Sequence, residues 1–202
     1  MLSGDREEGD AIAVALLSRL SDLAPVCFVN GNHEMCVERH QPERYQKFMD
    51  DLKNGGVQVL HNETAWFWID GEKVAVTGYE LPWEYYRRFS RRHPSVVGME
   101  RSIGKRKQDA YQILLTHNPV FFEEYTAWGA DFTFAGHLHG GFIRLPYFGG
   151  VISPQFQLFP KYDHGLYQMD TSSMVVGAGM GNHSGLFRIN NPTEIVTVRI
   201  KR

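Results

Sequence analysis

Two histidines two residues apart follow a short apolar run near the middle of the chain's second half. The stretch Phe134–Gly141 reads Phe-Ala-Gly-His-Leu-His-Gly-Gly, so His137 and His139 lie beside three glycines. Side chains alternate in an extended chain, so the two imidazoles share a side only while strand geometry persists, and the glycines let the chain bend around a bound centre. Two such imidazoles could bind two different metal ions, but histidine is also an ordinary turn residue. The motif alone leaves both interpretations open.

Three other apolar runs also end in polar residues. The four positions that follow such runs are Asp5, Asn32, His117 and His137. Because ligands collect beyond the carboxyl ends of parallel strands, we expect these side chains to converge. A carboxylate, an amide oxygen and two imidazoles suit Zn, Mn, Fe or Co better than Ca, which prefers oxygen, or Cu(I), which prefers sulfur. Each residue by itself is typical of a turn or a core, and the shared position at strand ends favours the metal site.

Amphipathic stretches alternate with these short apolar runs. The repeat of Ile12, Leu16, Leu20 and Leu23 predicts a helix over 10–23, and a second helix is expected over 42–54. Asp70-Gly71 predicts a tight hairpin turn. The expected strands are 26–29, 57–60, 65–69, 73–77, 113–116, 132–135, 164–169, 173–176 and 195–200, and 140–161 is expected to be a long loop framing the site. This order indicates an α/β fold in a single domain over 1–202.

Composition restricts the class of protein. The 202 residues are 43% hydrophobic and 22% charged with a net charge of -2, which indicates one globular domain and argues against a nucleic-acid partner. Two cysteines, Cys27 and Cys36, are too few for a disulfide framework. No apolar run approaches the roughly 18 residues of a membrane span. We therefore expect a soluble, cytoplasmic protein.

The segment 79–111 differs from the rest of the chain in charge. It has eight Lys or Arg residues against four Asp or Glu, interleaved with aromatic residues, and we interpret it as a surface insertion. Basic side chains among aromatics could hold a phosphate-bearing or lipid headgroup, and a solvated loop is the alternative. The expected partners are a phosphoester substrate and a membrane surface contacted peripherally through 79–111.

Taken together, the motifs resemble those of the calcineurin-like metallophosphoesterase superfamily. Gly4-Asp5, Gly31–Glu34, His117 and Gly136–His139 match its motifs in order and approximate spacing. The longer forms Leu115–Pro119, Gly136–Gly141 and Arg188–Ile195 look like its bacterial phosphodiesterase branch, which includes membrane-associated and lipid-phosphate hydrolases. The resemblance implies a four-layer α/β/β/α sandwich that hydrolyses phosphoesters, with phosphodiesters or lipid-linked phosphates as the expected substrates.

The resemblance also implies a site for two divalent ions, of Mn, Fe, Zn or Co. By that analogy Asp5 bridges both ions. The first ion is completed by Asn32, His117 and His137, and the second is bound by His139. Two cations about 3.5–4 Å apart can lower the pKa of a water and clamp the attacking and leaving oxygens, so no nucleophilic side chain is required.

The same resemblance gives catalytic roles to the two residues after Asn32. His33 would face the substrate, stabilising charge on the phosphoryl oxygens or protonating the leaving alkoxide. Glu34 stands where the family often has Asp, and it either orients His33 or is an ordinary loop carboxylate.

The chain departs from the family pattern at its beginning. The first motif, Asp-x-His on the first strand, would lie upstream of Gly4, where the sequence has only three residues. We therefore expect a domain short of about one N-terminal strand, with one tightly bound metal and weak or absent hydrolysis. The rival hypothesis is a non-catalytic member that keeps one metal as a binding module.

Overall fold

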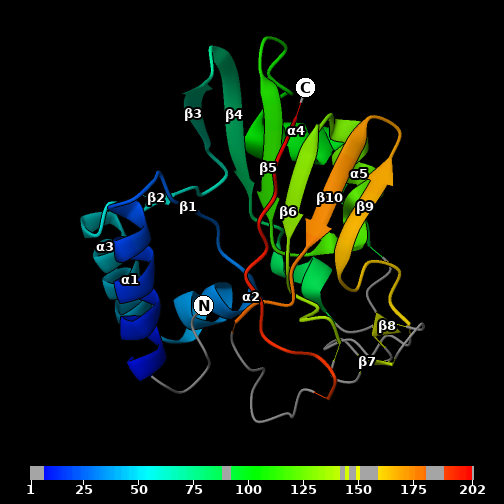
Figure 1. Ribbon diagram of the computed structural model, residues 1–202. Coiled ribbons are helices and arrows are strands. Elements are labelled where there is room, and N and C mark those ends of the chain that lie inside the picture. The colour runs from blue at the N-terminus through cyan, green and yellow to red at the C-terminus, as the bar shows by residue number, and fades with distance from the viewer. Residues whose placement is uncertain are drawn as a thin grey trace.

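A six-stranded sheet forms the centre of the computed structural model, which describes residues 7–87, 92–141, 144–145, 149–150, 159–180 and 189–201 (Figure 1). Its strands, in spatial order, are β3 (Thr64–Ile69), β4 (Glu72–Tyr79), β5 (Tyr111–Thr116), β6 (Phe132–Ala135), β10 (Ser172–Val176) and β9 (Gly165–Met169). The four inner strands are parallel to one another, and β3 and β9 pair antiparallel at the two edges. The inner strands therefore present their carboxyl ends at one side of the sheet.

The hairpin between β3 and β4 forms at the predicted turn. Asp70 and Gly71 both have positive φ angles, 51° and 82°, as a primed two-residue turn requires. Thr64 faces Thr77 and Ile69 faces Glu72, so pairing runs the full length of β3.

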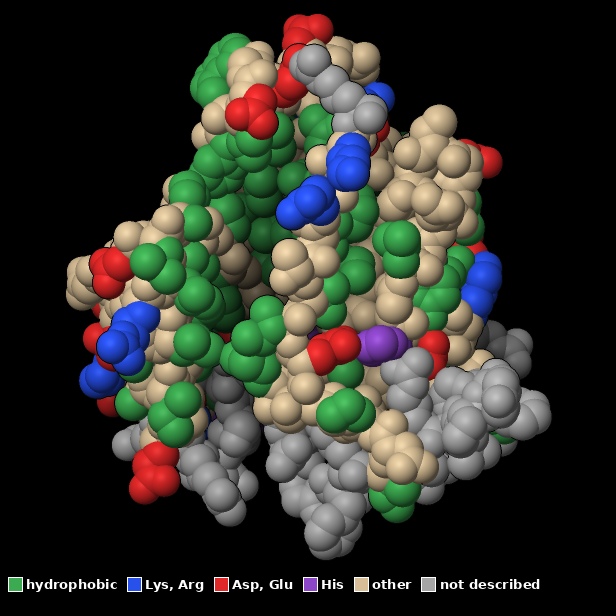
Figure 2. Space-filling view, in the orientation of Figure 1, with side chains coloured by type: hydrophobic (Ala, Val, Ile, Leu, Met, Phe, Trp, Pro, Cys, Tyr) green, Lys and Arg blue, Asp and Glu red, His purple; other side chains and the backbone are tan. Residues whose placement is uncertain are grey.

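A second, smaller sheet lies beside the first. It consists of β1 (Cys27–Phe28) and β2 (Gln58–Val59), which run parallel and are covered by α1 (Glu7–Ser21) and α3 (Pro42–Asn54). Phe28 packs toward these helices, whereas Cys27 packs toward β3, β4 and β5. Figure 2 shows apolar side chains lining the hollow between the smaller sheet and the large sheet.

Two helices cover the opposite face of the large sheet. α4 (Val96–Ile103) and α5 (Phe122–Trp128) lie behind it in Figure 1, and Leu114 of β5 is buried among their side chains. Helices, two-stranded sheet, six-stranded sheet and helices follow one another in space. This order confirms the expected α/β class and its α/β/β/α layering.

The segment 79–111 is not the surface insertion that its charge suggested. Tyr79, Leu81, Tyr86, Met99 and Ile103 are all buried in the core beneath the large sheet. The prediction was wrong because apolar residues spaced between the basic ones form the short 3₁₀ helix η1 (Trp83–Tyr86) and α4, which turn their apolar sides inward. Residues 88–91 lie outside the described part of the chain.

Two helices differ from what the sequence analysis expected. The stripe chosen for 10–23 is exposed, with Ile12 at 69% and Leu20 at 43%, because α1 packs on its neighbours through Ala13, Val14 and Leu17 instead. α2 (Asn32–His40) was not predicted at all. Its polar sequence gives little apolar periodicity, so the residues after β1 resembled a loop.

The predicted strand 195–200 is wrong as well. Residues 191–201 have no regular secondary structure and run across the face of the large sheet (Figure 1). The segment borders a surface hollow together with Phe132, Leu166 and Val175 of the large sheet, and its backbone joins no strand ladder. Apolar alternation alone does not provide a pairing partner.

Most of the predicted loop over 140–161 lies outside the described residues. Its described parts include β7 (Arg144–Leu145) and β8 (Gly149–Gly150), which pair antiparallel. None of the helices in the described part of the chain has the length and apolar content that crossing a bilayer requires.

The burial of α4 predicts a large loss of stability on truncating its inner side chain. Met99→Ala should lower the free energy of unfolding by about 2–5 kcal/mol, because Met99 is fully buried and its removal leaves a cavity. Val97→Ala on the same helix is the control, since Val97 is 56% exposed. Urea denaturation of both variants checks this, and equal small losses would restore the surface-insertion interpretation.

Candidate metal and phosphoester site

Two imidazoles meet at the carboxyl ends of the neighbouring parallel strands β5 and β6. The ring centroids of His117 and His137 lie 4.9 Å apart in an edge-to-face arrangement. The backbone amide of Gly136 donates a hydrogen bond of 3.1 Å to the carbonyl of His117, which fixes the two strand ends together. The sequence prediction that these two histidines converge is confirmed by this geometry.

His117 is held as a neutral base. Burial lowers its pKa to about 3, and the nearby His139 and His33 lower it further because a second positive charge would be repelled. The ring of Tyr86 packs 6.1 Å from His117 and 5.3 Å from His137, measured between centroids. A neutral imidazole in an apolar wall retains the lone pair that a metal ion needs.

The loop after β6 has an unusual backbone. His137 and His139 have φ angles of 65° and 50°, a region that residues other than glycine seldom occupy, and Gly140 and Gly141 follow at 69° and 82°. The prediction that glycines bend this loop is confirmed, but the bend includes both histidines. Each such residue costs on the order of 1 kcal/mol, so the surrounding contacts must hold the loop in place.

Asn191 and Ala178 supply those contacts. The buried amide of Asn191 donates to the carbonyl oxygens of His139 and Gly141, the latter at 2.8 Å. His139 Nδ1 lies 3.3 Å from the carbonyl oxygen of Ala178. Because a carbonyl can only accept, Nδ1 carries the proton in this hydrogen bond and the lone pair is on Nε2. Sequence reasoning included Asn191 in the Arg188–Ile195 motif but gave it no role in the site.

The start of α2 approaches the same place from the smaller sheet. A Cβ atom on Gly31 would lie 2.8 Å from His117 Nδ1, so the imidazole packs directly on the Gly31 backbone. Glu34 Oε2 accepts a 2.8 Å hydrogen bond from the Gly31 amide and so caps the helix. Glu34 therefore has a structural contact, and its predicted orientation of His33 stays a prediction.

Asn32 presents an amide oxygen that fits a metal ligand. Its Oδ1 atom is buried and has no hydrogen-bond partner among the described residues, which is costly for a polar atom unless an ion or water satisfies it. An amide oxygen beside neutral imidazoles is a donor set that divalent first-row metals accept. Asn32, His117 and His137 thus fit the first predicted ion.

The structure says less about the other predicted metal ligands, Asp5 and His139. Asp5, the predicted bridge, lies outside the described residues. Within the described ranges, no three His, Cys, Asp or Glu side chains gather closely enough to hold an ion by themselves. The fit therefore depends on two imidazoles and the Asn32 amide, and the second ion near His139 stays a prediction.

A polar network supports the backbone immediately before Asn32. Asn30, which is buried, donates to Tyr45 Oη at 2.7 Å, and burial raises the pKa of Tyr45 to about 12. His61 Nδ1 lies 2.9 Å from Glu80 Oε1, and this hydrogen bond raises the pKa of His61. This network connects Asn30, at the end of β1, to neighbouring elements. Sequence reasoning missed its hydrogen bonds because the two partners of each are 15 to 50 residues apart.

Comparison with known proteins places this α/β fold, with its histidine cluster at strand ends, in a class of metal-dependent hydrolases. The profile described as calcineurin-like phosphoesterase matches residues 3–141. The chain therefore belongs to the calcineurin-like phosphoesterase family, a family of divalent-metal phosphoesterases.

Three curated relatives are similar to the chain. It is 27% identical over 157 residues to the uncharacterized protein YpbG of Bacillus subtilis, covering 74% of this chain and 53% of the relative. It is 30% identical over 102 residues to the uncharacterized metallophosphoesterase YkuE of the same species, covering 50% and 35%. It is 24% identical over 185 residues to the phosphodiesterase YaeI of Escherichia coli, covering 92% and 62%. The chain thus spans less than two thirds of each of these relatives, and no solved structure matches it.

The contact between Gly31 and His117 predicts a metal-binding defect. Gly31→Ala should weaken divalent-metal binding about tenfold or more, because the new methyl group would displace the imidazole. The backbone of Gly31, at φ -102°, already suits alanine, so strain in the main chain does not confound the result. Gly136→Ala is the matched control, since its Cβ would meet nothing within 4 Å. Metal titration followed by elemental analysis checks the pair, and equal affinities would disprove the close packing.

The His61–Glu80 pair predicts a pH-dependent contribution to stability. The pKa of His61 is raised in the folded protein, so the stabilisation is present below its ordinary pKa and is lost as pH rises through the raised value. His61→Gln should therefore destabilise the protein more near about pH 5 than near about pH 9, by no more than about 1 kcal/mol because the ring is partly exposed. Glu80→Gln should remove the same pH-dependent part. A loss from His61→Gln that is identical at both pH values would contradict the pairing.

Proposed function

We propose that this chain is a divalent-metal-dependent phosphodiesterase domain. The observation that supports it most is the neutral His117, which packs on His137 and on the Gly31 backbone next to Asn32 with its unsatisfied oxygen, in a member of the calcineurin-like phosphoesterase family. A phosphodiester is the proposed substrate because the relative YaeI is named a phosphodiesterase. Lipid-linked phosphates are the other substrate class proposed.

The residues that would hold the first ion are Asn32, His117 and His137, with Asp5 as the proposed bridge and His139 as the ligand of a second. Mn, Fe, Zn or Co all suit this set of oxygen and nitrogen donors. When bound, such an ion supplies Lewis acidity toward a phosphoryl oxygen and lowers the pKa of a water.

The chain's own residues would orient the phosphoryl group and handle a proton. His33 is the second residue of α2, beside Asn32, and it lies close enough to His117 to lower that residue's pKa. The amino end of α2 carries partial positive charge that favours a phosphoryl anion. We assign His33 to hydrogen-bond a phosphoryl oxygen and to give its proton to the leaving alkoxide.

Glu34 and Tyr86 would act on the site indirectly. Glu34 keeps the first turn of α2 in place through the Gly31 amide, so that Asn32 and His33 keep their direction. Tyr86 covers one side of the His117–His137 pair with its ring and excludes water from it. Neither residue needs to change its protonation for these roles.

Membrane contact through 79–111 is a separate proposal with less support. Of the basic residues described there, Arg92 pairs with Glu84 at 3.1 Å and Arg106 pairs with Asp131 at 2.9 Å. These pairs occupy part of the charge that a lipid headgroup would need. Vesicle binding that depends on Arg87 would support the contact.

The alternative function is a binding module that keeps one metal and hydrolyses nothing. The phosphodiesterase and the binding module differ in turnover, so hydrolysis of bis(p-nitrophenyl) phosphate by the metal-loaded chain distinguishes the two functions. A chain that takes up metal but shows no metal-dependent turnover would favour the module.

A His33→Ala substitution tests the proposed proton donor. The kcat for bis(p-nitrophenyl) phosphate should fall by about 10²–10⁴-fold, because general-acid assistance is lost while the metal donors remain. Metal content should match that of the unsubstituted chain. His93→Ala is the control, since His93 is exposed and pairs with Glu124. Unchanged kcat in His33→Ala would remove His33 from the mechanism.

A further inference from the structure

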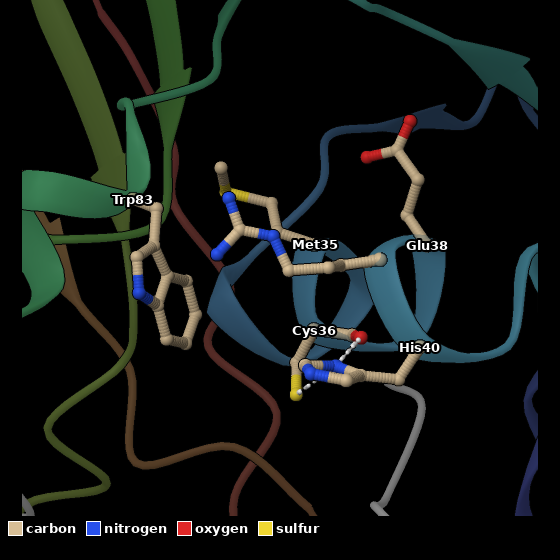
Figure 3. Close-up of a pocket in the computed structure, with 6 residues that line it drawn as sticks. Met35, Cys36, Glu38, His40 and Trp83 are labelled. Atoms are coloured by element: carbon tan, nitrogen blue, oxygen red, sulfur yellow. Dashed lines mark hydrogen bonds between the residues drawn. The ribbon is translucent and has the colours of Figure 1, made fainter.

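A groove opens between α2 and η1, the two elements that also carry Asn32 and Tyr86 of the candidate site. Figure 3 shows residues from the two elements facing one another across it. Its volume is about 290 Å³, which suits one ring-sized group rather than a large ligand. The lining residues are Met35, Cys36, Glu38, Arg39, His40 and Trp83.

One wall of the groove continues the metal site along α2. Asn32, Met35 and Arg39 are spaced by three and four residues, so they lie on one face of the helix. At a rise of about 1.5 Å per residue, the stretch from Asn32 to Arg39 covers about 10 Å. The side chain of Asn32 is thus at the site end of this face and that of Arg39 at the outer end.

The opposite wall has the same direction. Trp83 and Tyr86 are three residues apart in η1, where such residues are stacked one above the other, and their rings lie 6.4 Å apart. Tyr86 packs its ring 5.3 Å from His137. Trp83 therefore continues outward from the histidine pair, as Met35 does on the facing helix.

The lining has the chemistry of a site for a flat, apolar group. Trp83 is 39% exposed, although indoles usually bury their faces when a neighbour is available. Met35 is partly buried and adds an adaptable thioether. Arg39 is exposed and forms no ion pair with any residue in the described ranges, so its planar guanidinium is available to stack.

We propose that this groove binds one ester group of the phosphodiester and selects an aromatic group there. This inference rests on the proposed function and deepens it by naming the substrate class. With the phosphorus at the histidine pair, an aryl ester would extend between Trp83 and the face of α2. A methyl ester in the same place would leave the groove empty and gain no stacking.

Binding of two phosphonates to the metal-loaded chain tests the groove without requiring turnover. Phenylphosphonate and methylphosphonate share a headgroup and differ only in the group that the groove would hold. Calorimetry should give a Kd for phenylphosphonate about tenfold lower than for methylphosphonate, the size expected for aromatic contact with burial. In Trp83→Ala this ratio should fall to near one with the Kd of methylphosphonate unchanged, and Trp83→Phe should keep most of it.

Trp68→Ala is the matched control, because Trp68 is 72% exposed on β3 and does not line the groove. Arg39→Ala should lower the ratio by a smaller factor. A ratio near one in the unsubstituted chain, a ratio that Trp83→Ala leaves unchanged, or no phenylphosphonate binding at millimolar concentration would each overturn the groove assignment.

Hydrolysis of bis(p-nitrophenyl) phosphate in parallel separates this inference from the proposed function. A chain that is inert toward the diester but shows a Trp83-dependent phosphonate ratio would refute the hydrolase and keep the groove. A chain that hydrolyses the diester with a ratio independent of Trp83 would keep the hydrolase and refute the groove.

Discussion

The close packing of the Gly31 backbone on the His117 ring is the constraint on which the rest of the site depends. It brings the end of β1, in the smaller sheet, against the end of β5, in the larger one, with no room for a side chain between them. Asn32 follows Gly31 immediately in the chain, so its backbone lies next to this contact on the side of the smaller sheet. An apolar cluster that joins the two sheets holds this approach, since Cys27 packs against the β3–β5 side chains. The strand ends that carry the proposed metal donors are therefore brought together by sheet packing rather than by a local sequence motif.

The same packing determines the electrostatics. His117 is half-buried and near other imidazoles, so its pKa falls to about 3 and it stays a neutral donor. The left-handed backbone of His137 and His139 is unfavourable by itself and is held by Asn191 and Ala178. Strain, burial and an unsatisfied amide oxygen occur together at one end of the sheet. This combination is expected where a fold is organised around a bound cation and not around its own stability.

The elements with strong local signals could be predicted from the sequence. The runs ending at His117 and His137 are mostly apolar and became neighbouring parallel strands, and the Asp70-Gly71 turn formed as expected. Features decided by distant partners could not be predicted. The polar start of α2 depends on the Glu34 cap, and the segment 195–200 alternates like a strand but lies on a sheet face without an edge to pair with. Tyr86 joined the site because 79–111 folds inward, which its charge concealed.

Anomalous X-ray diffraction from crystals grown with Mn²⁺ tests the central claim most directly. One proposed ligand, Asn32, follows a strand of the smaller sheet, and the other two, His117 and His137, follow strands of the large sheet. An ion that touches all three can be present only if the sheets meet as described. The account predicts a manganese peak in contact with the Asn32 oxygen and with one nitrogen of each of the two imidazoles. Full occupancy by manganese elsewhere, with these three side chains making no contact to it, would contradict the account.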